Sequence, residues 1–273
     1  MTLRLATWNV NSVKARLPRL LDWLETAAPD VVALQETKST DAAFPYDALS
    51  ALGYEAAHNG DGRWNGSAVL SRVGLADVEL AFAGQPPFDP PATEDDALLP
   101  LVAEPTVEAR AVGATCGGIR VWSLYVPNGR SLVDPHYAYK LAWLAALRDA
   151  LAPQVAAGPC VVTGDFNIAP TDDDVWDRAV FDDSTHVTAA ERDALAAIRD
   201  LGLIDVIPRP GKGDRPFTFW DYRAGMFHKD LGMRIDLVLA TPGLAVTDAF
   251  VDREARKGTG PSDHAPVVVD LDL

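Results

Sequence analysis

The chain has 273 residues, of which 48% are hydrophobic, and it carries a formal net charge of −15. Its two cysteines exclude a disulfide framework, its N-terminus lacks the apolar core of a signal peptide, and no stretch is long enough to span a membrane. We therefore expect one domain over residues 1–273, in a cytoplasmic protein without membrane contact, because the length suffices for an ordinary core and no composition break divides it.

Short apolar runs predict seven β-strands, and apolar residues at helical spacing predict two helices. The first helix follows Asn11 and Ser12, with Pro18 early enough to be tolerated. The strands are Leu3–Trp8, Val31–Gln35, Ser67–Ser71, Ile119–Val126, Cys160–Thr163, Ile235–Ala240 and Pro266–Leu273. The helical stripes are Leu17, Leu20, Leu21, Leu24 and Tyr137, Leu141, Leu144, Leu147, Leu151. Several strands are joined by connections too short for a crossover helix, which favours a mixed sheet.

Polar side chains stand at the ends of several predicted strands. Asn9 ends the first strand, Glu36 follows the second, and Asp165 and Asn167 form a turn after a strand of fully apolar character. Each has an ordinary alternative, since a lone Asn can satisfy a turn, an acidic residue can be solvated surface, and Gly-Asp-Phe-Asn can be a structural turn. Together they indicate a rim where carboxylate and amide groups meet.

A second signal joins two distant segments near the C-terminus. Asp236 interrupts an apolar run, and a carboxylate there needs a partner. Asp263 and His264 lie between Pro261 and Pro266 just before a strand. We expect His264 to be the partner of Asp236, because a carboxylate fixes the tautomer of an imidazole.

These groups suit hydrolysis of a phosphodiester. The reaction requires an oriented water, a divalent cation and donors to the phosphoryl oxygens. Mg²⁺ prefers oxygen ligands and keeps part of its water shell, so one or two carboxylates such as Glu36 suffice. Amides such as Asn9 and Asn167 supply neutral donors.

The motifs, taken in order, resemble the endonuclease/exonuclease/phosphatase superfamily, and within it the exodeoxyribonuclease III and abasic-site endonuclease branch. The resemblance covers nearly the whole chain. It implies a four-layered α/β sandwich, with two face-to-face mixed β-sheets flanked by helices and the site at one rim. The motifs are Asn9, Leu34–Lys38, Tyr125–Asn128, Gly164–Ile168, Met233–Leu237 and Ser262–His264.

The resemblance also implies roles for individual residues. Metal positions fall on Glu36, Asn9 and Asp263, with Mg²⁺ as the cofactor and Mn²⁺ as a substitute; the number of ions stays open. The catalytic positions are Asp165 for the attacking water, Asn167 for the scissile phosphate, His264 with Asp236 for a phosphoryl oxygen, Tyr125 for the leaving group or the phosphate, and Asn128 for the DNA backbone.

The acidic total argues at first against a polyanionic partner, but the charge is unevenly distributed. Residues 209–257 hold nine Lys or Arg against seven Asp or Glu. By contrast, residues 84–108 hold six acidic residues, no basic ones and six prolines, which predicts an extended surface excursion away from substrate. DNA is therefore expected to bind residues 209–257, where basic residues outnumber acidic ones.

That segment contains Phe217–Arg223, whose rings either pack beneath a loop or contact an unstacked nucleotide. By resemblance, Phe219, Met233 and Ile235 form an apolar pocket for a baseless deoxyribose, which costs less to extrude than an intact nucleotide. Trp220 is expected to contact DNA as well. Phosphate contacts are expected from Arg130, Arg223 and Lys229, which could equally be solvated surface.

The expected protein is a DNA repair nuclease that cuts double-stranded DNA 5′ to abasic sites, with 3′ to 5′ exonuclease action and cleaning of blocked 3′ ends. We expect it to act as a monomer, associated with the nucleoid if bacterial. Two alternatives stay open: a phosphodiesterase or phosphatase of the same superfamily with another substrate, and a catalytically inactive DNA-binding member.

Overall fold

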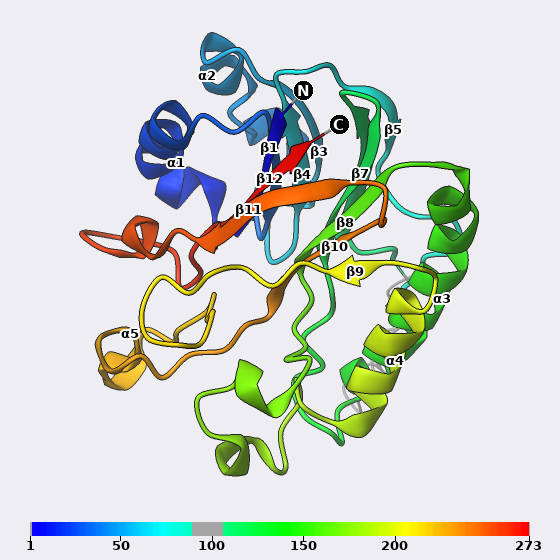
Figure 1. The fold of residues 1–273 in the computed structure, drawn as a ribbon, viewed down its shortest axis with the longest axis vertical. Helices are drawn as coiled ribbons and strands as arrows, with labels where there is room; N and C mark the ends of the chain where they lie inside the picture. Colours follow the sequence, from blue (N-terminus) through cyan, green and yellow to red (C-terminus); the bar gives the residue numbers. More distant parts are fainter. Residues whose placement is uncertain (1, 89–105, 273) are drawn as a thin grey trace, which may run out of the picture.

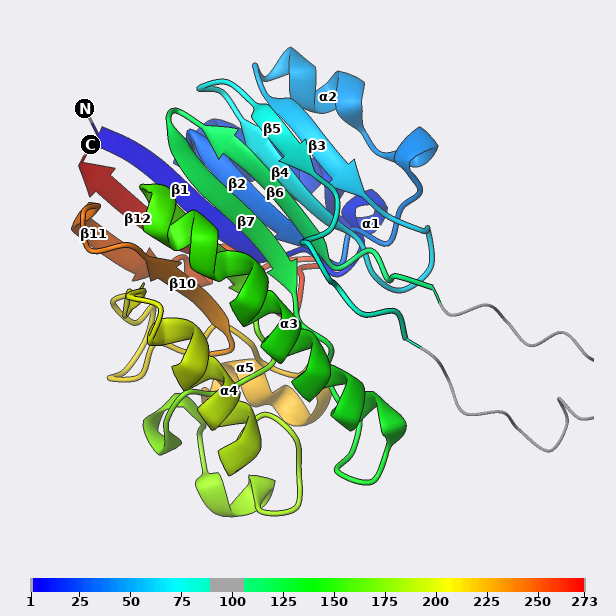
Figure 2. The same cartoon turned by 90° about the vertical axis from the view of Figure 1, so that its right-hand side faces the viewer.

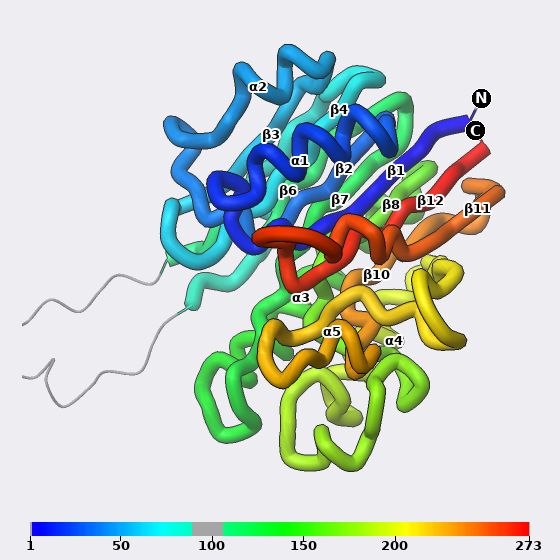
Figure 3. Tube along the Cα trace, turned by 90° about the vertical axis from the view of Figure 1, so that its left-hand side faces the viewer, coloured from blue at the N-terminus to red at the C-terminus, as the bar shows by residue number. Residues whose placement is uncertain are grey.

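A computed structural model describes residues 2–88 and 106–272. The described residues form two six-stranded sheets that pack face to face, with helices on both outer faces. Figure 2 shows α3 (Pro135–Ala157) and α4 (Ala189–Arg199) covering one sheet. Figure 3 shows α1 (Val13–Ala27) in front of the other sheet, with α2 (Tyr46–Ala51) beside it. This is the four-layered α/β sandwich expected from the sequence.

The first sheet has the order β11-β12-β1-β2-β4-β3. Within it β1 and β2 run parallel, and the other neighbours run antiparallel. Pairing of β1 with β12 places both chain ends at the same edge of the molecule (Figure 1). Its strands are β1 (Thr2–Asn9), β2 (Val31–Gln35), β3 (Glu55–Asn59), β4 (Ser67–Ser71), β11 (Ala245–Val251) and β12 (Val267–Asp272).

The second sheet repeats this plan in the order β5-β6-β7-β8-β10-β9. Here β7 and β8 are the parallel pair, with antiparallel neighbours on both sides. Its strands are β5 (Ala76–Glu79), β6 (Ala111–Cys116), β7 (Ile119–Tyr125), β8 (Cys160–Asp165), β9 (Ile204–Asp205) and β10 (Asp236–Ala240).

Three buried clusters separate the four layers. Side chains such as Leu5, Val69 and Val161 fill the space between the sheets. A second cluster, around Trp143, packs α3 and α4 onto the second sheet, and a third, around Trp23, packs α1 and α2 onto the first. The central strands are therefore covered on both faces, which explains why they read as continuous apolar runs.

Strands of both sheets place polar residues at one rim of the sandwich. The parallel pairs β1/β2 and β7/β8 end there with their carboxyl ends, while the antiparallel neighbours β10 and β12 begin there. Residues at the ends of the first four strands and at the starts of the other two consequently meet, although they are far apart in sequence.

The seven predicted strands and both predicted helices are present. The structure adds five strands that were not predicted: β3, β5, β6, β9 and β11. All five lie outside the central parallel pairs: β3, β5, β9 and β11 are partly exposed, which weakens the apolar pattern, and the buried β6 consists mostly of small residues. The structure also adds α2, α4 and a short helix at Met226–Lys229, although Thr188 and Glu191 form a capping box that marks the start of α4. Pro18 lies in the second turn of a continuous α1.

The predicted excursion at 84–108 is described only at its two ends. There Phe88 and Thr106 form an antiparallel bridge, with the amide of Phe88 donating to the carbonyl of Thr106 at 3.1 Å. Residues 89–105, which contain most of that prediction, lie outside the described residues. Within the described ranges, no helix is both long and apolar enough to cross a membrane.

Gly164 on β8 offers a test of how the rim is built. A Cβ at this position would overlap the carbonyl of Leu124 on β7, and its φ of 141° disfavours other residues. We expect Gly164→Ala to lower the free energy of unfolding by about 1–3 kcal/mol in urea titrations and to reduce activity. Gly158→Ala is the control, since a Cβ there meets nothing within 4 Å; equal stability of the two variants would contradict the close approach.

Candidate active site

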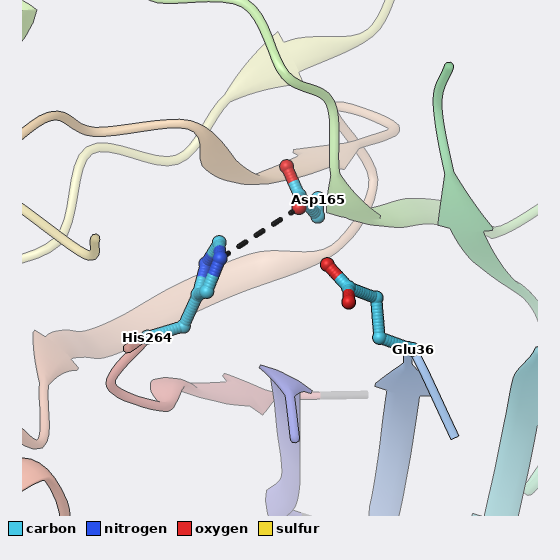
Figure 4. A group of neighbouring side chains, drawn as sticks. All are labelled: Glu36, Asp165 and His264. Carbon is cyan, nitrogen blue, oxygen red and sulfur yellow. Dashed lines mark ion pairs between the residues drawn. The ribbon is translucent and has the colours of Figure 1, made fainter. Parts of the chain in front are cut away.

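Glu36, Asp165 and His264 converge at the rim. Each offers a ligand atom within 4.8 Å of the others' ligand atoms, and Figure 4 shows the three side chains pointing toward one another. Glu36 follows β2 of the first sheet, Asp165 ends β8 of the second, and His264 precedes β12. The two sheets thus contribute to one centre.

Asn9 links the two carboxylates. Its Nδ2 donates to Glu36 Oε1 at 2.8 Å and to Asp165 Oδ2 at 2.9 Å, while its Oδ1 accepts from the amide of Asn11 at 3.0 Å. In this arrangement Asn9 presents nitrogen, not oxygen, to the centre. It therefore holds the carboxylates in place, and its expected role as a metal ligand stays a prediction.

Lys38 balances the charge of Glu36. Its Nζ lies 2.8 Å from Glu36 Oε2 and donates to Asn11 Oδ1 at 2.6 Å. Burial acts to raise the pKa of Glu36, but Lys38 and the Asn9 amide outweigh it, so the pKa is lowered and the carboxylate is charged at neutral pH.

Asp165 is buried and close to other acidic groups. Its Oδ1 accepts the amide of Asn167 at 2.9 Å. Burial raises its pKa to about 7; His264 opposes this shift, and Asp236 and Glu36 add to it. A carboxylate near this value can accept a proton from a water molecule at physiological pH.

His264 and Asp236 form the expected pair, with His264 Nδ1 2.8 Å from Asp236 Oδ2. Burial alone would lower the pKa of His264, but Asp236 raises it to about 10, so the ring is an imidazolium at neutral pH. Its Nε2 lies 3.8 Å from Asp165 Oδ2 and points into the centre. The ring can therefore donate to an anionic oxygen.

Tyr125 ends β7 beside this group. Arg110 lies over its ring, 4.8 Å from the centroid. Burial, followed by the charge of Glu36, holds the pKa of the phenol well above its ordinary value, so Tyr125 keeps its proton and serves as a neutral donor.

The amides expected to fix phosphate lie side by side. Asn128 Nδ2 donates to Asn167 Oδ1 at 3.1 Å, and Asn167 Nδ2 donates to the carbonyl of Val126 at 3.0 Å. His186, which the sequence did not single out, places its Nε2 3.0 Å from Asn167 Oδ1. An isolated histidine outside any apolar run gave no signal for this contact.

Asp263 lies outside the three-residue group. Its Oδ1 accepts from Asn11 Nδ2 at 3.0 Å, so Asn11 connects it to Lys38. The structure thus places Asp263 at the edge of the centre, and its expected metal role stays a prediction. Asn11, a second residue that sequence reasoning missed, stands at the start of α1, where an Asn reads as a turn residue.

The predicted apolar pocket residues form one cluster next to the centre. Phe219, Met233 and Ile235 pack with Val175 and Val187. The Phe219 ring lies 4.8 Å from the His264 ring, and Phe219 and Met233 exchange backbone hydrogen bonds of 2.9 Å. Phe219 is partly exposed and the other two are buried.

Trp220, which the sequence analysis expected to contact DNA, is buried. It is 1% exposed, its indole donates to Asp230 Oδ1 at 3.1 Å, and it packs against Phe227. Alternation along the chain turns it away from Phe219 and into a separate core cluster, so it is not available to contact DNA. Trp220 supports the loop from beneath.

The three predicted phosphate contacts are exposed cations. Arg223 is paired with Asp221 at 3.0 Å, Arg130 lies 3.9 Å from Asp134, and Lys229 projects from the short helix α5 (Met226–Lys229). Their position on the surface is compatible with contacts to a DNA backbone, and those contacts stay predictions.

The residues present fit a divalent cation. Glu36 and Asp165 direct carboxylate oxygens to one point, which suits a hard cation. Lys38 faces Glu36 and His264 faces Asp165, which shows that the negative charge of the carboxylates needs compensation. Glu36 would hold the ion, with the Asp165 carboxylate beside it, whereas His264 is engaged by Asp236. A cation bound there would supply a charge that stabilises the phosphoryl oxygens.

The fold is a four-layered sandwich, and its rim carries a buried acid, an imidazolium, a phenol and two amides around a cation site. This combination is typical of a phosphoester hydrolase. The model of the Endonuclease/Exonuclease/phosphatase family matches residues 6–264, and the chain belongs to that family. It is a hydrolytic nuclease of DNA repair.

Similar proteins agree with this assignment. A 3′-5′ exonuclease, NExo, from Neisseria meningitidis is 35% identical, with a TM-score of 0.88, over 99% of this chain and 100% of that one. A second structure of NExo, described as a 3′ phosphatase bound to product DNA hairpin, is 34% identical, with a TM-score of 0.87 and the same coverage. An AP endonuclease from Archaeoglobus fulgidus is 32% identical, with a TM-score of 0.86, over 99% of this chain and 100% of that one. Exodeoxyribonuclease III from Haemophilus influenzae is 29% identical over 97% of this chain and 98% of its own.

Replacing Glu36 tests the cation site. We expect Glu36→Gln to weaken Mg²⁺ binding in calorimetric titrations by about 10-fold or more, because a charged oxygen ligand is lost, while DNA binding in chelator changes little. Glu25→Gln on α1, distant from the rim, is the control. Unchanged Mg²⁺ affinity in Glu36→Gln would remove this residue from the metal shell.

The Asp236–His264 pair makes a second prediction. Single variants His264→Ala and Asp236→Ala should each reduce kcat, and the double variant should be no slower than the slower single one, because the two side chains act as a unit. Single-turnover cleavage rates of the four proteins measure this. Rate losses that multiply in the double variant would show that the residues work independently.

Proposed function

We propose that this nuclease hydrolyses phosphate esters of double-stranded DNA, 5′ to abasic sites and at blocked 3′ ends, with Mg²⁺ as cofactor and Mn²⁺ as a substitute. The observation that carries the proposal is the convergence of Glu36, Asp165 and His264 beside the apolar cluster of Phe219, Met233 and Ile235. One chain supplies every group, which supports action as a monomer.

The groups divide the chemistry among them. Asp165 takes a proton from the attacking water, because its pKa of about 7 suits a general base. The His264 imidazolium and the amide of Asn167 donate to phosphoryl oxygens, and the Tyr125 phenol donates to the leaving oxygen. Glu36 would hold the cation, which would add charge stabilisation at the same oxygens.

The apolar cluster supports selection of a baseless sugar. Phe219 stands between the His264 ring and Met233, so a deoxyribose against it would lie next to the catalytic donors. A nucleotide that has lost its base costs less to extrude than a paired one.

Preference for 3′ ends over internal abasic sites is the second candidate. Its specific support is that the two NExo structures, described as a 3′-5′ exonuclease and a 3′ phosphatase, are 35% and 34% identical to this chain. The AP endonuclease is 32% identical. Both candidates use the same centre, and they differ in whether the strand continues beyond the sugar.

Two labelled duplexes separate the candidates. One carries an internal tetrahydrofuran abasic analogue and the other a nick with a 3′-phosphate, and each is incubated with Mg²⁺ or with chelator. We expect metal-dependent cleavage 5′ to the analogue with a 3′-hydroxyl product, and release of phosphate from the nick. Release of phosphate from the nick without cleavage at the analogue would favour the second candidate, a preference for 3′ ends. Cleavage of neither, with activity on a small phosphodiester, would replace DNA as the substrate.

Phe219→Ala tests the pocket. We expect it to reduce cleavage at the abasic analogue about 10-fold more than removal of nucleotides from an intact 3′ end, because the wall that contacts the baseless sugar is lost. The ratio of the two kcat/KM values measures this. Val246→Ala, at the end of β11 opposite the rim, should leave the ratio unchanged, and equal losses in Phe219→Ala would place the selectivity elsewhere.

A further inference from the structure

A buried ion pair lies directly beneath the loops that carry the phosphate-binding amides. Lys140 on α3 and Glu191 on α4 are both 0% exposed, and Lys140 Nζ lies 2.6 Å from Glu191 Oε1. The role of this pair is not explained by packing of the two helices, because apolar residues such as Leu144 and Leu195 already join them to the core.

Lys140 binds the backbone of both loops. Its Nζ donates to the carbonyl of Asn167 at 2.7 Å and to that of Asn128 at 3.3 Å. A single ammonium thus joins the segment after β8 to the segment after β7. Asn167 has a φ of 50°, a left-handed conformation that needs support from its surroundings.

Glu191 supports the same amides from the other side. Its Oε1 accepts the backbone amide of His186 at 2.9 Å, and its Oε2 accepts that of Thr188 at 3.0 Å. The ring of His186 then places Nε2 3.0 Å from Asn167 Oδ1 and 3.2 Å from Asn128 Nδ2. The pair therefore reaches both the backbone and the side chain of Asn167.

Energetics argue against a purely stabilising role. Desolvation of two buried charges consumes most of the energy that their attraction provides, so such a pair gives little net stability compared with apolar residues. What the pair provides here is direction, because Lys140 Nζ and Glu191 Oε1 bind the loops that carry Asn128, Asn167 and His186, while Glu191 Oε2 caps α4.

We propose that Lys140 and Glu191 are positioning residues that hold Asn167 and Asn128 in the geometry required at the scissile phosphate. The inference rests on the proposed function, since it assigns a task to those amides. Neither residue touches substrate; both act through the two loops.

The central test is the double variant Lys140→Met/Glu191→Gln, which removes both charges and keeps similar volumes. Lys140→Met alone leaves Glu191 buried without its partner and should have the lowest Tm, while the double variant should recover part of the loss. We expect the folded double variant to lose about 10- to 100-fold in kcat on the 3′-phosphate or abasic duplex, because loose amides misplace the phosphate. Its Mg²⁺ affinity should stay within about twofold, since Glu36 is untouched.

A thermodynamic cycle shows whether the effect passes through Asn167. In an Asn167→Ala background the same double substitution should cost less than about threefold in kcat, because the group that it positions is already gone. Rate losses that multiply in this background would overturn the proposal, and so would a folded double variant with the kcat of the wild type.

Two further measurements test the proposal without depending on the stability of the double variant or on a DNA substrate. Glu191→Gln alone is the milder variant and should reduce kcat about three- to tenfold. The side-chain amide signals of Asn128 and Asn167 in ¹⁵N NMR spectra should shift in Glu191→Gln without any DNA, whereas those of Asn59 should not. Unshifted signals would overturn the proposal, while a wild-type protein inactive on DNA would overturn only the proposed function.

Arg148→Met is the matched control. Arg148 lies on α3 as well, but its ion pair with Asp149 is exposed and ends on no active-site loop. We expect unchanged kcat, Tm and amide signals. A kcat loss in Arg148→Met equal to that in the Lys140 variants would show that charge on α3, and not the buried pair, is what matters.

Discussion

The site depends on how repulsion between two carboxylates from different sheets is offset. Glu36 and Asp165 approach each other at a buried rim, where the low effective dielectric strengthens repulsion between like charges. Asn9 donates to both, and positive charge from Lys38 and His264 flanks them. A cation bound there would offset the same negative charges. The need for positive charge beside the two carboxylates therefore indicates that the rim is suited to bind a cation.

The topology explains why the carboxylates meet. Each sheet contains one parallel pair, and the carboxyl ends of both pairs face the same rim. Asn9 and Glu36 come from one pair, and Tyr125 and Asp165 come from the other. The antiparallel neighbours start where those strands end, which brings Asp236 opposite Asp165 in the register of β10 and β8. The sandwich therefore brings acid, base and donors together at one rim.

Buried polar pairs set the orientation of these groups. Asp236 fixes the ring of His264 and keeps it protonated, while Lys140 and Glu191 bind the segments of Asn128 and Asn167. Such pairs add little to net stability but restrict the directions in which a side chain can point. Positioned donors cost no reorganisation at the moment of reaction, which is the main source of electrostatic stabilisation in a hydrolase.

Local sequence patterns identify the polar residues at strand ends, because an apolar run followed by a polar residue is visible in a short stretch of chain, as for Glu36 and Asp165. The Asp236–His264 pair could be inferred as well, because a carboxylate inside an apolar run needs a partner. Which atoms face the centre depends on the fold. It turned Asn9 Nδ2 toward the carboxylates, sent Trp220 into the core, and brought His186 and Lys140 to Asn167. These contacts join segments far apart in the chain, and their partners are chosen by packing of whole layers, which no short stretch of sequence encodes.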